Sequence, residues 1–141
     1  MDPQELAEKV VRKMMDDDAF SRWLEIEVAE IAPGRSVLEM TVTETMTNGF
    51  GVTHGGVTFS LADSALAFAS NSYGRVAVAL ENNISYVRRV NEGDRLTAEA
   101  TELSLGRRIA VYEITVTNQE DRKVALFRGT VFRTQDHHFP R

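Results

Sequence analysis

One residue in this chain stands out as a candidate for chemistry, and it is Asp63. Between Thr45 and Gly74, thirty residues, no other Asp, Glu, Lys or Arg occurs, whereas the chain's average of 26% would place about eight there. The apolar pattern predicts a buried helix over residues 57–71, and mid-helix aspartate has poor propensity and no capping role. Asp63 is therefore either a structural carboxylate satisfied in the core or a catalytic base or nucleophile in a desolvated pocket.

A second feature, His54-Gly55-Gly56, comes just before that helix. A helix N-terminus presents unpaired backbone N–H groups and the positive end of a dipole. Glycine lets a ligand carbonyl approach this backbone, which can then stabilise an oxyanion. Gly-Gly before a helix is often only a turn. Combined with a solitary carboxylate in the same helix, it favours catalysis over a structural role.

The elements that must position these residues follow from hydrophobic periodicity. Asp2, Pro3 and Glu5 indicate the start of an amphipathic helix over residues 3–18, within an N-terminal helical segment 1–20. A glycine-containing loop is expected over residues 46–56. Six strands are expected at 24–32, 36–43, 75–87, 94–105, 107–118 and 123–134, and a flexible tail at 135–141. This predicts an α+β fold in a single domain, residues 1–141, with an antiparallel sheet wrapped around a central helix.

Composition narrows the possible partners. The net charge of −5 argues against general nucleic-acid binding, and no apolar run reaches the roughly 20 residues that span a bilayer. The absence of cysteine and of a signal-peptide pattern predicts a soluble, cytoplasmic protein. His137-His138 lacks a spaced partner, so no metal site is expected. The pairs Arg88-Arg89 and Arg107-Arg108 are either solvated strand ends or a site for an anionic ligand.

The motifs together resemble a known family. The stretch from Asn48 to Gly56, its continuation Phe59-Ser60-Leu61-Ala62-Asp63-Ser64-Ala65, and residues 84–88 and 124–130 resemble the hotdog-fold acyl-CoA thioesterases, in particular the phenylacetyl-CoA thioesterase (PaaI-like) group. The resemblance begins at about residue 20 and implies the hotdog fold. It also implies a place in phenylacetic acid catabolism and hydrolysis of (hydroxy)phenylacetyl-CoA, or of a related aryl or medium-chain acyl-CoA.

The resemblance further implies roles for individual residues. Asp63 would activate water or attack the thioester, Gly55 would donate its N–H to the thioester oxygen, and His54 and Asn48 would form and orient the site. Coenzyme A is part of the substrate, and no cofactor is expected. Substrate- and CoA-binding roles are expected for Arg88, Arg89, Arg107, Gly56 and Ser64. Ser64 is included because some relatives have a water-assisting serine where this chain has Ala79.

Helix geometry adds a point of its own. Gly55 and Asp63 are eight residues apart, which is ~12 Å along one helix. A general base must come within about 3 Å of the proton it takes, directly or through a water. The two groups are therefore expected to serve one site only across a subunit interface. We expect a homodimer, assembling to a homotetramer in accord with the resemblance.

Two other functions remain open. An enoyl- or hydroxyacyl-CoA hydratase-dehydratase on the same fold would need a histidine and an acid that exchange protons at adjacent carbons. His54 leads directly into the glycines, which suits it better to shaping the turn. A non-catalytic acyl-CoA-binding module would have little reason to keep a lone carboxylate in an apolar helix.

Overall fold

The computed structural model describes residues 1–140, which form three α-helices, a short 3-10 helix and six strands. The helical elements are α1 (Pro3–Asp17), α2 (Ala19–Trp23), η1 (Glu44–Met46) and α3 (Gly55–Asn71). The strands are β1 (Glu27–Ala32), β2 (Arg35–Thr41), β3 (Arg75–Tyr86), β4 (Arg95–Leu105), β5 (Ile109–Thr117) and β6 (Lys123–His137). The predicted α+β architecture is confirmed.

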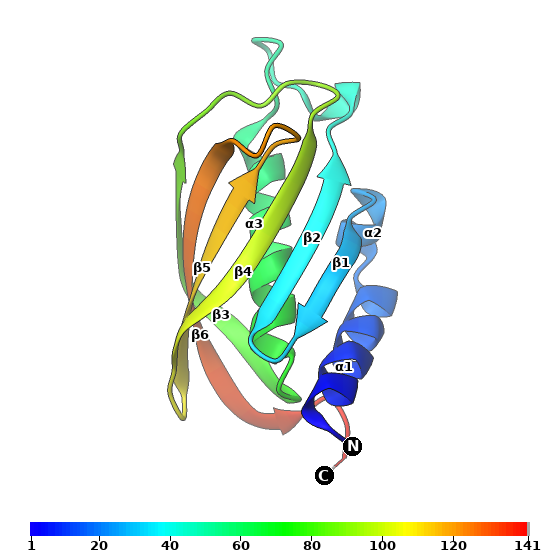
Figure 1. Ribbon diagram of the computed structural model, residues 1–141, viewed down its shortest axis with the longest axis vertical. Helices are drawn as coiled ribbons and strands as arrows, with labels where there is room; N and C mark the ends of the chain where they lie inside the picture. Colours follow the sequence, from blue (N-terminus) through cyan, green and yellow to red (C-terminus); the bar gives the residue numbers. More distant parts are fainter. Residues whose placement is uncertain (141) are drawn as a thin grey trace.

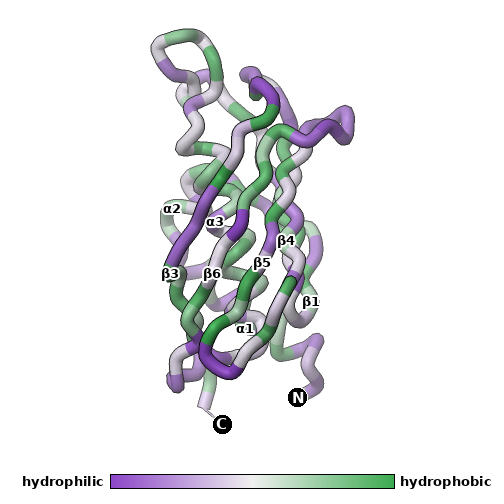
Figure 2. Tube along the Cα trace, turned by 90° about the vertical axis from the view of Figure 1, so that its left-hand side faces the viewer, coloured by the Kyte–Doolittle hydropathy of each residue, from purple (hydrophilic) through white to green (hydrophobic). Residues whose placement is uncertain are grey.

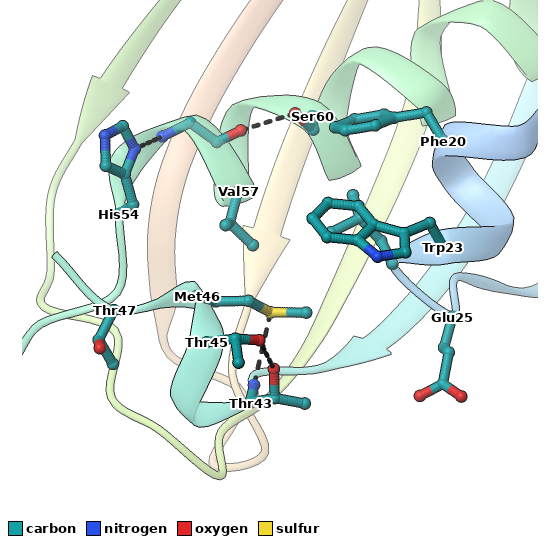
Figure 3. Close-up of a pocket in the computed structure, with 12 residues that line it drawn as sticks. Phe20, Trp23, Glu25, Thr43, Thr45, Met46, Thr47, His54, Val57 and Ser60 are labelled. Carbon is teal, nitrogen blue, oxygen red and sulfur yellow. Dashed lines mark hydrogen bonds between the residues drawn. The ribbon is translucent and has the colours of Figure 1, made fainter.

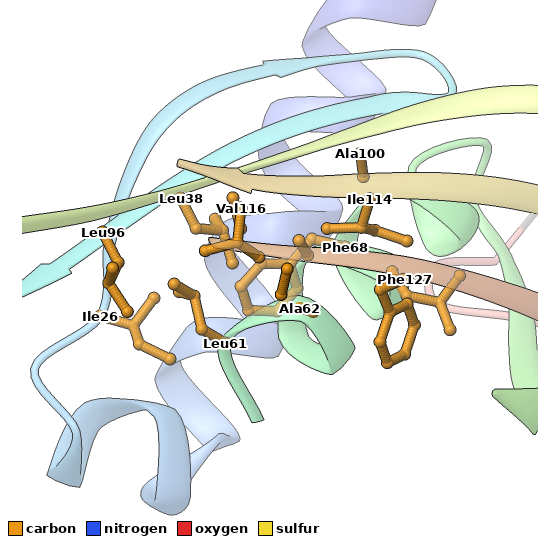
Figure 4. Packing of buried hydrophobic residues seen from close by; sticks show 14 of the residues in the cluster. Ile26, Leu38, Leu61, Ala62, Phe68, Leu96, Ala100, Ile114, Val116 and Phe127 are labelled. Atoms are coloured by element: carbon orange, nitrogen blue, oxygen red, sulfur yellow. The ribbon is translucent and has the colours of Figure 1, made fainter. Parts of the chain in front are cut away.

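The strands form one antiparallel sheet in the order β1-β2-β4-β5-β6-β3, curved around α3 (Figure 1). Its concave face and the apolar circumference of α3 make the core, where Leu61, Phe68, Leu38, Ile114 and Phe127 are buried (Figure 4). Alternation along β5 and the first half of β4 places every second side chain in this core. The sheet therefore fixes α3 along nearly its whole length.

Helix α1 packs on the edge of the domain, against β1 and α3. Its start matches the expectation, because the Asp2 side chain accepts a hydrogen bond from the Glu5 N–H and Pro3 opens the first turn. Val10 and Val11 turn inward, while charged residues of the helix face outward. None of the helices within residues 1–140 is long and apolar enough to cross a membrane.

Two expectations for the chain's ends and edges are corrected. The expected tail begins inside β6, which continues through His137, paired with Arg75. Beyond it, the His138 N–H donates to the Gly74 carbonyl at 2.9 Å, and Lys9 and Lys13 lie over the Phe139 ring. We refer to the contacts of His138 and Phe139 as the C-terminal clasp. They order a segment whose polar sequence alone indicated a tail.

The first expected strand is also shorter than predicted. Residues 19–23 form α2, and β1 begins only at Glu27. Asp18 caps α2 by accepting from the Ser21 N–H at 2.9 Å, and the chain then turns through Glu25, whose φ is +56°. The strand-like alternation of Leu24 and Ile26 instead reflects two buried side chains on either side of that turn.

Candidate active site

The N-terminus of α3 is built by the His54-Gly55-Gly56 motif. His54 is the N-cap, and its Nδ1 accepts a hydrogen bond from the Gly56 N–H at 2.9 Å. The helix begins at Gly55, two residues earlier than the periodicity predicted. Within residues 1–140, the Gly55 N–H has no acceptor. It is thus a free donor at the positive end of the helix dipole.

Tyr86 defines one side of this donor. Its hydroxyl donates to the Gly55 carbonyl at 2.9 Å, and a Cβ added at Gly55 would lie 3.1 Å from the tyrosine ring. A side chain at position 55 would therefore push against Tyr86, whereas glycine keeps the approach to the N–H open.

Asn48 shapes the loop that leads into the motif. Its Oδ1 accepts from the N–H groups of Phe50 at 2.8 Å and Val52 at 3.3 Å, which is the kind of side-chain-supported turn asparagine favours. The His54 N–H then donates to the Met46 carbonyl at 2.8 Å. Asn48 and His54 therefore both act on the backbone that presents Gly55.

Asp63 lies two turns further along α3 and is half-buried. Its Oδ1 accepts a hydrogen bond from the Asn82 amide of β3 at 3.2 Å. Burial raises the pKa of the Asp63 carboxyl, the Asn82 hydrogen bond lowers it, and the negative charge of Asp18 raises it again. The net shift of the Asp63 pKa is upward.

The structure confirms that Gly55 and Asp63 belong to one continuous helix. At 1.5 Å per residue their positions are ~12 Å apart along its axis. One chain therefore does not bring the Asp63 carboxylate to a carbonyl held by the Gly55 N–H. One chain offers the Gly55 N–H and the Asp63 carboxylate at two separate places, and neither group has the other beside it.

The arginine pairs lie at opposite ends of the sheet. Arg88 and Arg89 follow β3 near the Tyr86 end, where the Arg88 N–H approaches the Val124 carbonyl at 3.4 Å. Arg107 lies in the β4–β5 turn at the other end, beside a cavity of about 590 Å³ that Arg75, Arg108 and Arg133 also line. The expected CoA-binding arginines are therefore not gathered by one chain.

Ser64 makes a contact within the chain. It is buried, and its Oγ lies 2.8 Å from the Ser21 Oγ of α2, which itself bonds to Asp18. This contact joins α2 to α3, so the Ser64 hydroxyl has a partner within the chain. Within residues 1–140, no three His, Cys, Asp or Glu side chains gather as a metal site would require.

Comparison with other proteins identifies the family of this chain. The profile of the thioesterase superfamily matches residues 50–125, the segment from the loop before α3 to the start of β6. The chain belongs to the thioesterase superfamily. It is a thioester hydrolase of the hotdog fold, and the matched segment contains His54, Gly55 and Asp63.

Individual relatives of this thioesterase agree in sequence and structure. The acyl-coenzyme A thioesterase PaaI of Escherichia coli is 43% identical over 120 residues, covering 85% of this chain and 86% of that protein. The solved structure of the E. coli PaaI protein matches with a TM-score of 0.94 and 39% identity, covering 96% and 99% of the two chains. A Streptococcus mutans protein solved with acetyl-CoA bound matches with a TM-score of 0.77 and 30% identity, over 79% and 90%. The predicted likeness to the PaaI-like group is confirmed.

Two residues of the candidate site were missed from the sequence. Asn82 holds the Asp63 carboxylate, and Tyr86 covers Gly55. The signal for Asn82 was its place in a hydrophilic segment, Glu81-Asn82-Asn83, within an otherwise strand-forming run, because asparagine is depleted in strands (Figure 2). Tyr86 gave no such signal, since tyrosine is common in strands.

A cavity of about 510 Å³ adjoins the donor end of α3 in this thioesterase. Helix α2, the η1 segment and the first turns of α3 enclose it, and His54, Gly56, Val57 and Ser60 form its α3 side (Figure 3). This volume lies within the range of about 300–1,000 Å³ typical of small-molecule sites. Its lining includes His54 and Gly56, the residues on either side of Gly55.

Proposed function

We propose that this chain hydrolyses acyl-CoA thioesters at sites shared by two subunits, the Gly55 N–H of one and the Asp63 carboxylate of the other acting on the same thioester. The observation that carries the proposal is the unbroken helix α3, with a free N–H at its start and a half-buried carboxylate of raised pKa two turns later. The named acyl-CoA thioesterases among the relatives, and the relative with bound acetyl-CoA, support the substrate class.

The chemistry follows from these two groups. The thioester oxygen accepts a hydrogen bond from the Gly55 N–H, which stabilises the negative charge that develops there. Asp63 either takes a proton from water as that water attacks the carbonyl carbon, or attacks the carbon itself and forms an anhydride that water hydrolyses. In both routes the C–S bond breaks and the CoA sulfur leaves as a thiolate that takes up a proton. The products are the free acid and coenzyme A.

Strand β3 supports the shared site. It is an edge of the sheet, and within residues 1–140 no other strand pairs with its outer side. Over its twelve residues it exposes Val78 by 49% and Leu80 by 58%. A long edge strand with unpaired backbone groups and exposed apolar side chains is a pairing surface. A second copy paired there in antiparallel fashion would bring the Arg75 end of its β3 to the Tyr86 end of this one, and α3 of each copy beside the shared edge.

The same arrangement accounts for the separated arginines. Pairing through β3 would bring the Arg107 end of one subunit toward the Arg88 and Arg89 end of the other, where the CoA phosphates could bind to both.

Further parts of the proposal are a homotetramer of two such dimers, a cytoplasmic location and a role in phenylacetic acid catabolism. The proposed acyl group is a (hydroxy)phenylacetyl or related aryl or medium-chain group, and the reaction needs no cofactor beyond the CoA of its substrate.

A thiol-release assay with a panel of acyl-CoAs tests the activity. Steady turnover of free CoA is expected, with the free acid as the second product. Stoichiometric binding without turnover would instead indicate a non-catalytic acyl-CoA-binding module. Loss of the substrate without a free thiol would indicate a hydratase or dehydratase.

Mixed dimers test the shared site. Asp63→Ala and Asn48→Ala subunits, each first shown to be nearly inactive alone, are unfolded together and refolded. Each mixed dimer would carry both lesions in one site and none in the other. Random pairing should therefore restore about a quarter of wild-type activity. If mass spectrometry shows mixed dimers and the activity stays at the parents' level, the two residues do not meet across an interface.

A further inference from the structure

Two aromatic side chains of α2 are exposed next to the site. Trp23 is 73% exposed and Phe20 53% exposed, and their ring centroids lie 5.9 Å apart at an interplanar angle of 35°. The two rings form one apolar surface, which we call the aromatic pair. Large side chains exposed together in this way mark a ligand or partner site more often than isolated exposed residues do.

The aromatic pair forms the far wall of the cavity beside Gly55. The cavity runs from His54 and Gly56 past Val57 and Met46 to Phe20 and Trp23. Figure 3 shows Val57 and Met46 between His54 and the indole of Trp23. A group attached to a carbonyl held at Gly55 can therefore extend between apolar side chains until it reaches the rings.

The aromatic pair is held in place rather than loosely displayed. Asp18 caps the start of α2, and the Ser21–Ser64 contact ties α2 to α3. At the other end, the Ile26 N–H donates to the Ser21 carbonyl and the Glu25 N–H to the Arg22 carbonyl, both at 3.0 Å. This is a Schellman closure of the helix. A five-residue helix fixed at both ends can present two rings in a constant orientation.

We propose that the aromatic pair binds the acyl group of the substrate and makes this enzyme prefer flat, aryl acyl groups. The inference rests on the proposed acyl-CoA hydrolysis and adds the residues that set its specificity. An aromatic ring gains more from contact with another ring than its buried area alone provides, because edge-to-face and offset contacts are favourable. A flexible alkyl chain of similar length gains only the burial.

Competition between substrates tests the specificity. The ratio of kcat/KM for phenylacetyl-CoA to kcat/KM for hexanoyl-CoA is independent of the fraction of active enzyme. We expect Trp23→Ala to lower this ratio on the order of tenfold, and Trp23→Leu, which keeps apolar volume without the ring, to lower it almost as much. Phe20→Ala should lower it less, since Phe20 is the less exposed of the two rings. Leu103→Ala on β4, also exposed but away from the cavity, is the matched control and should leave the ratio unchanged.

The outcomes separate the two proposals. If wild-type enzyme releases no thiol from either substrate, the proposed hydrolysis fails. If hydrolysis proceeds and the ratio is the same in wild type, Trp23→Ala and Phe20→Ala, the aromatic pair does not bind the acyl group. If Trp23→Ala or Phe20→Ala changes the oligomeric state on gel filtration while the kcat/KM ratio stays at the wild-type value, a second copy of the chain covers the aromatic pair. That result would also overturn the inference.

A binding measurement tests the contact without turnover. Trp23 is the only tryptophan in the chain, so intrinsic fluorescence reports on this one side chain. In the Asp63→Asn variant, phenylacetyl-CoA at saturation by calorimetry should shift the emission to shorter wavelength, as the indole leaves water, and CoA alone should not. An unshifted emission with phenylacetyl-CoA, or an equal shift with CoA alone, would contradict the assignment.

Discussion

The two ends of helix α3 contrast sharply. At its C-terminal end polar groups are tied together: the Asn71 Oδ1 accepts from the Ala77 N–H at 2.9 Å and lies 2.7 Å from the His138 Nε2. Nearby, Glu102 accepts hydrogen bonds from Tyr73 at 2.8 Å and from the fully buried Tyr112 at 3.2 Å. At its N-terminal end the Gly55 N–H is free, and midway along the helix Asp63 accepts one long hydrogen bond.

The difference separates the hydrogen-bonded C-terminal end of the helix from its open N-terminal half. The Gly55 N–H is one of the donors that a helix N-terminus leaves without an intrahelical acceptor, and Asp63 accepts a single hydrogen bond, so both remain able to contact a ligand. The tied C-terminal end holds the helix so that the groups at the other end stay in position.

The largest effect is expected from Asp63→Asn. Removing a positioned base or nucleophile should lower kcat by ~10²–10⁴-fold. Stability should not fall: the pKa of Asp63 is higher in the fold than in the unfolded chain, so ionisation costs stability as the pH rises through that window, and asparagine removes this cost. Steady-state thiol release and urea unfolding at neutral pH measure the two effects. Retention of more than about a tenth of wild-type turnover would contradict the catalytic role of Asp63.

The opposite pattern is expected from Glu102→Ala, at the tied end. It leaves the Tyr73 and Tyr112 hydroxyls without their acceptor, which should lower the free energy of unfolding by ~1–3 kcal/mol. Burial and Glu102 together raise the pKa of Tyr73 to about 12, so both hydroxyls are protonated donors at neutral pH. Chemical denaturation gives the loss, and kcat/KM per folded enzyme should stay at the wild-type value. A fall in kcat/KM larger than the fall in folded fraction would show that the two ends are coupled.

A smaller effect concerns the pH profile. The acid limb of kcat/KM reports the pKa of an essential base in the free enzyme. Asn82→Ala removes the hydrogen bond that lowers the pKa of Asp63, so this limb should move to higher pH. Asp18→Asn removes a negative charge that raises the pKa, so the limb should move to lower pH, while asparagine still caps α2. Shifts in the same direction for both variants would mean that another group controls the limb.

The smallest effect is expected at Glu25, beside the aromatic pair. A non-glycine residue in the left-handed region costs about 1–2 kcal/mol, and glycine is the usual residue at this point of a Schellman closure. Because glycine also gains freedom in the unfolded chain, Glu25→Gly should stabilise the protein by about 1 kcal/mol. Glu8→Gly, in the exposed face of α1, is the control and should destabilise by a similar amount. Thermal melting of both variants shows whether each substitution raises or lowers stability. If Glu25→Gly is less stable than wild type, contacts of the Glu25 side chain offset the cost of its backbone conformation.

The sequence predicted the parts that depend on periodicity and on local motifs. The strands of the sheet, the buried helix and the glycine motif before it all follow from patterns within a few residues, whereas the N-cap role of His54 came only from the structure. Helix α2 was missed because five residues are too few to show a helical period. The Asp63–Asn82 contact joins residues 19 positions apart and depends on how β3 crosses α3. The separation of Arg88 from Arg107 depends on strand order, which no local pattern contains.

The C-terminal clasp has a consequence for engineering. Met1 and Pro140 line the same cavity beside Gly74, so the two ends of the described chain lie close together, away from Gly55 (Figure 1). A short glycine-rich linker could join them, and new ends could be opened in the exposed β5–β6 turn at residues 119–122. Such a circular permutant would preserve α3 and its surroundings. Because Ala125 at the start of β6 pairs with Tyr86, the new ends would lie at the Gly55 end of the molecule, where a tag or surface could be attached.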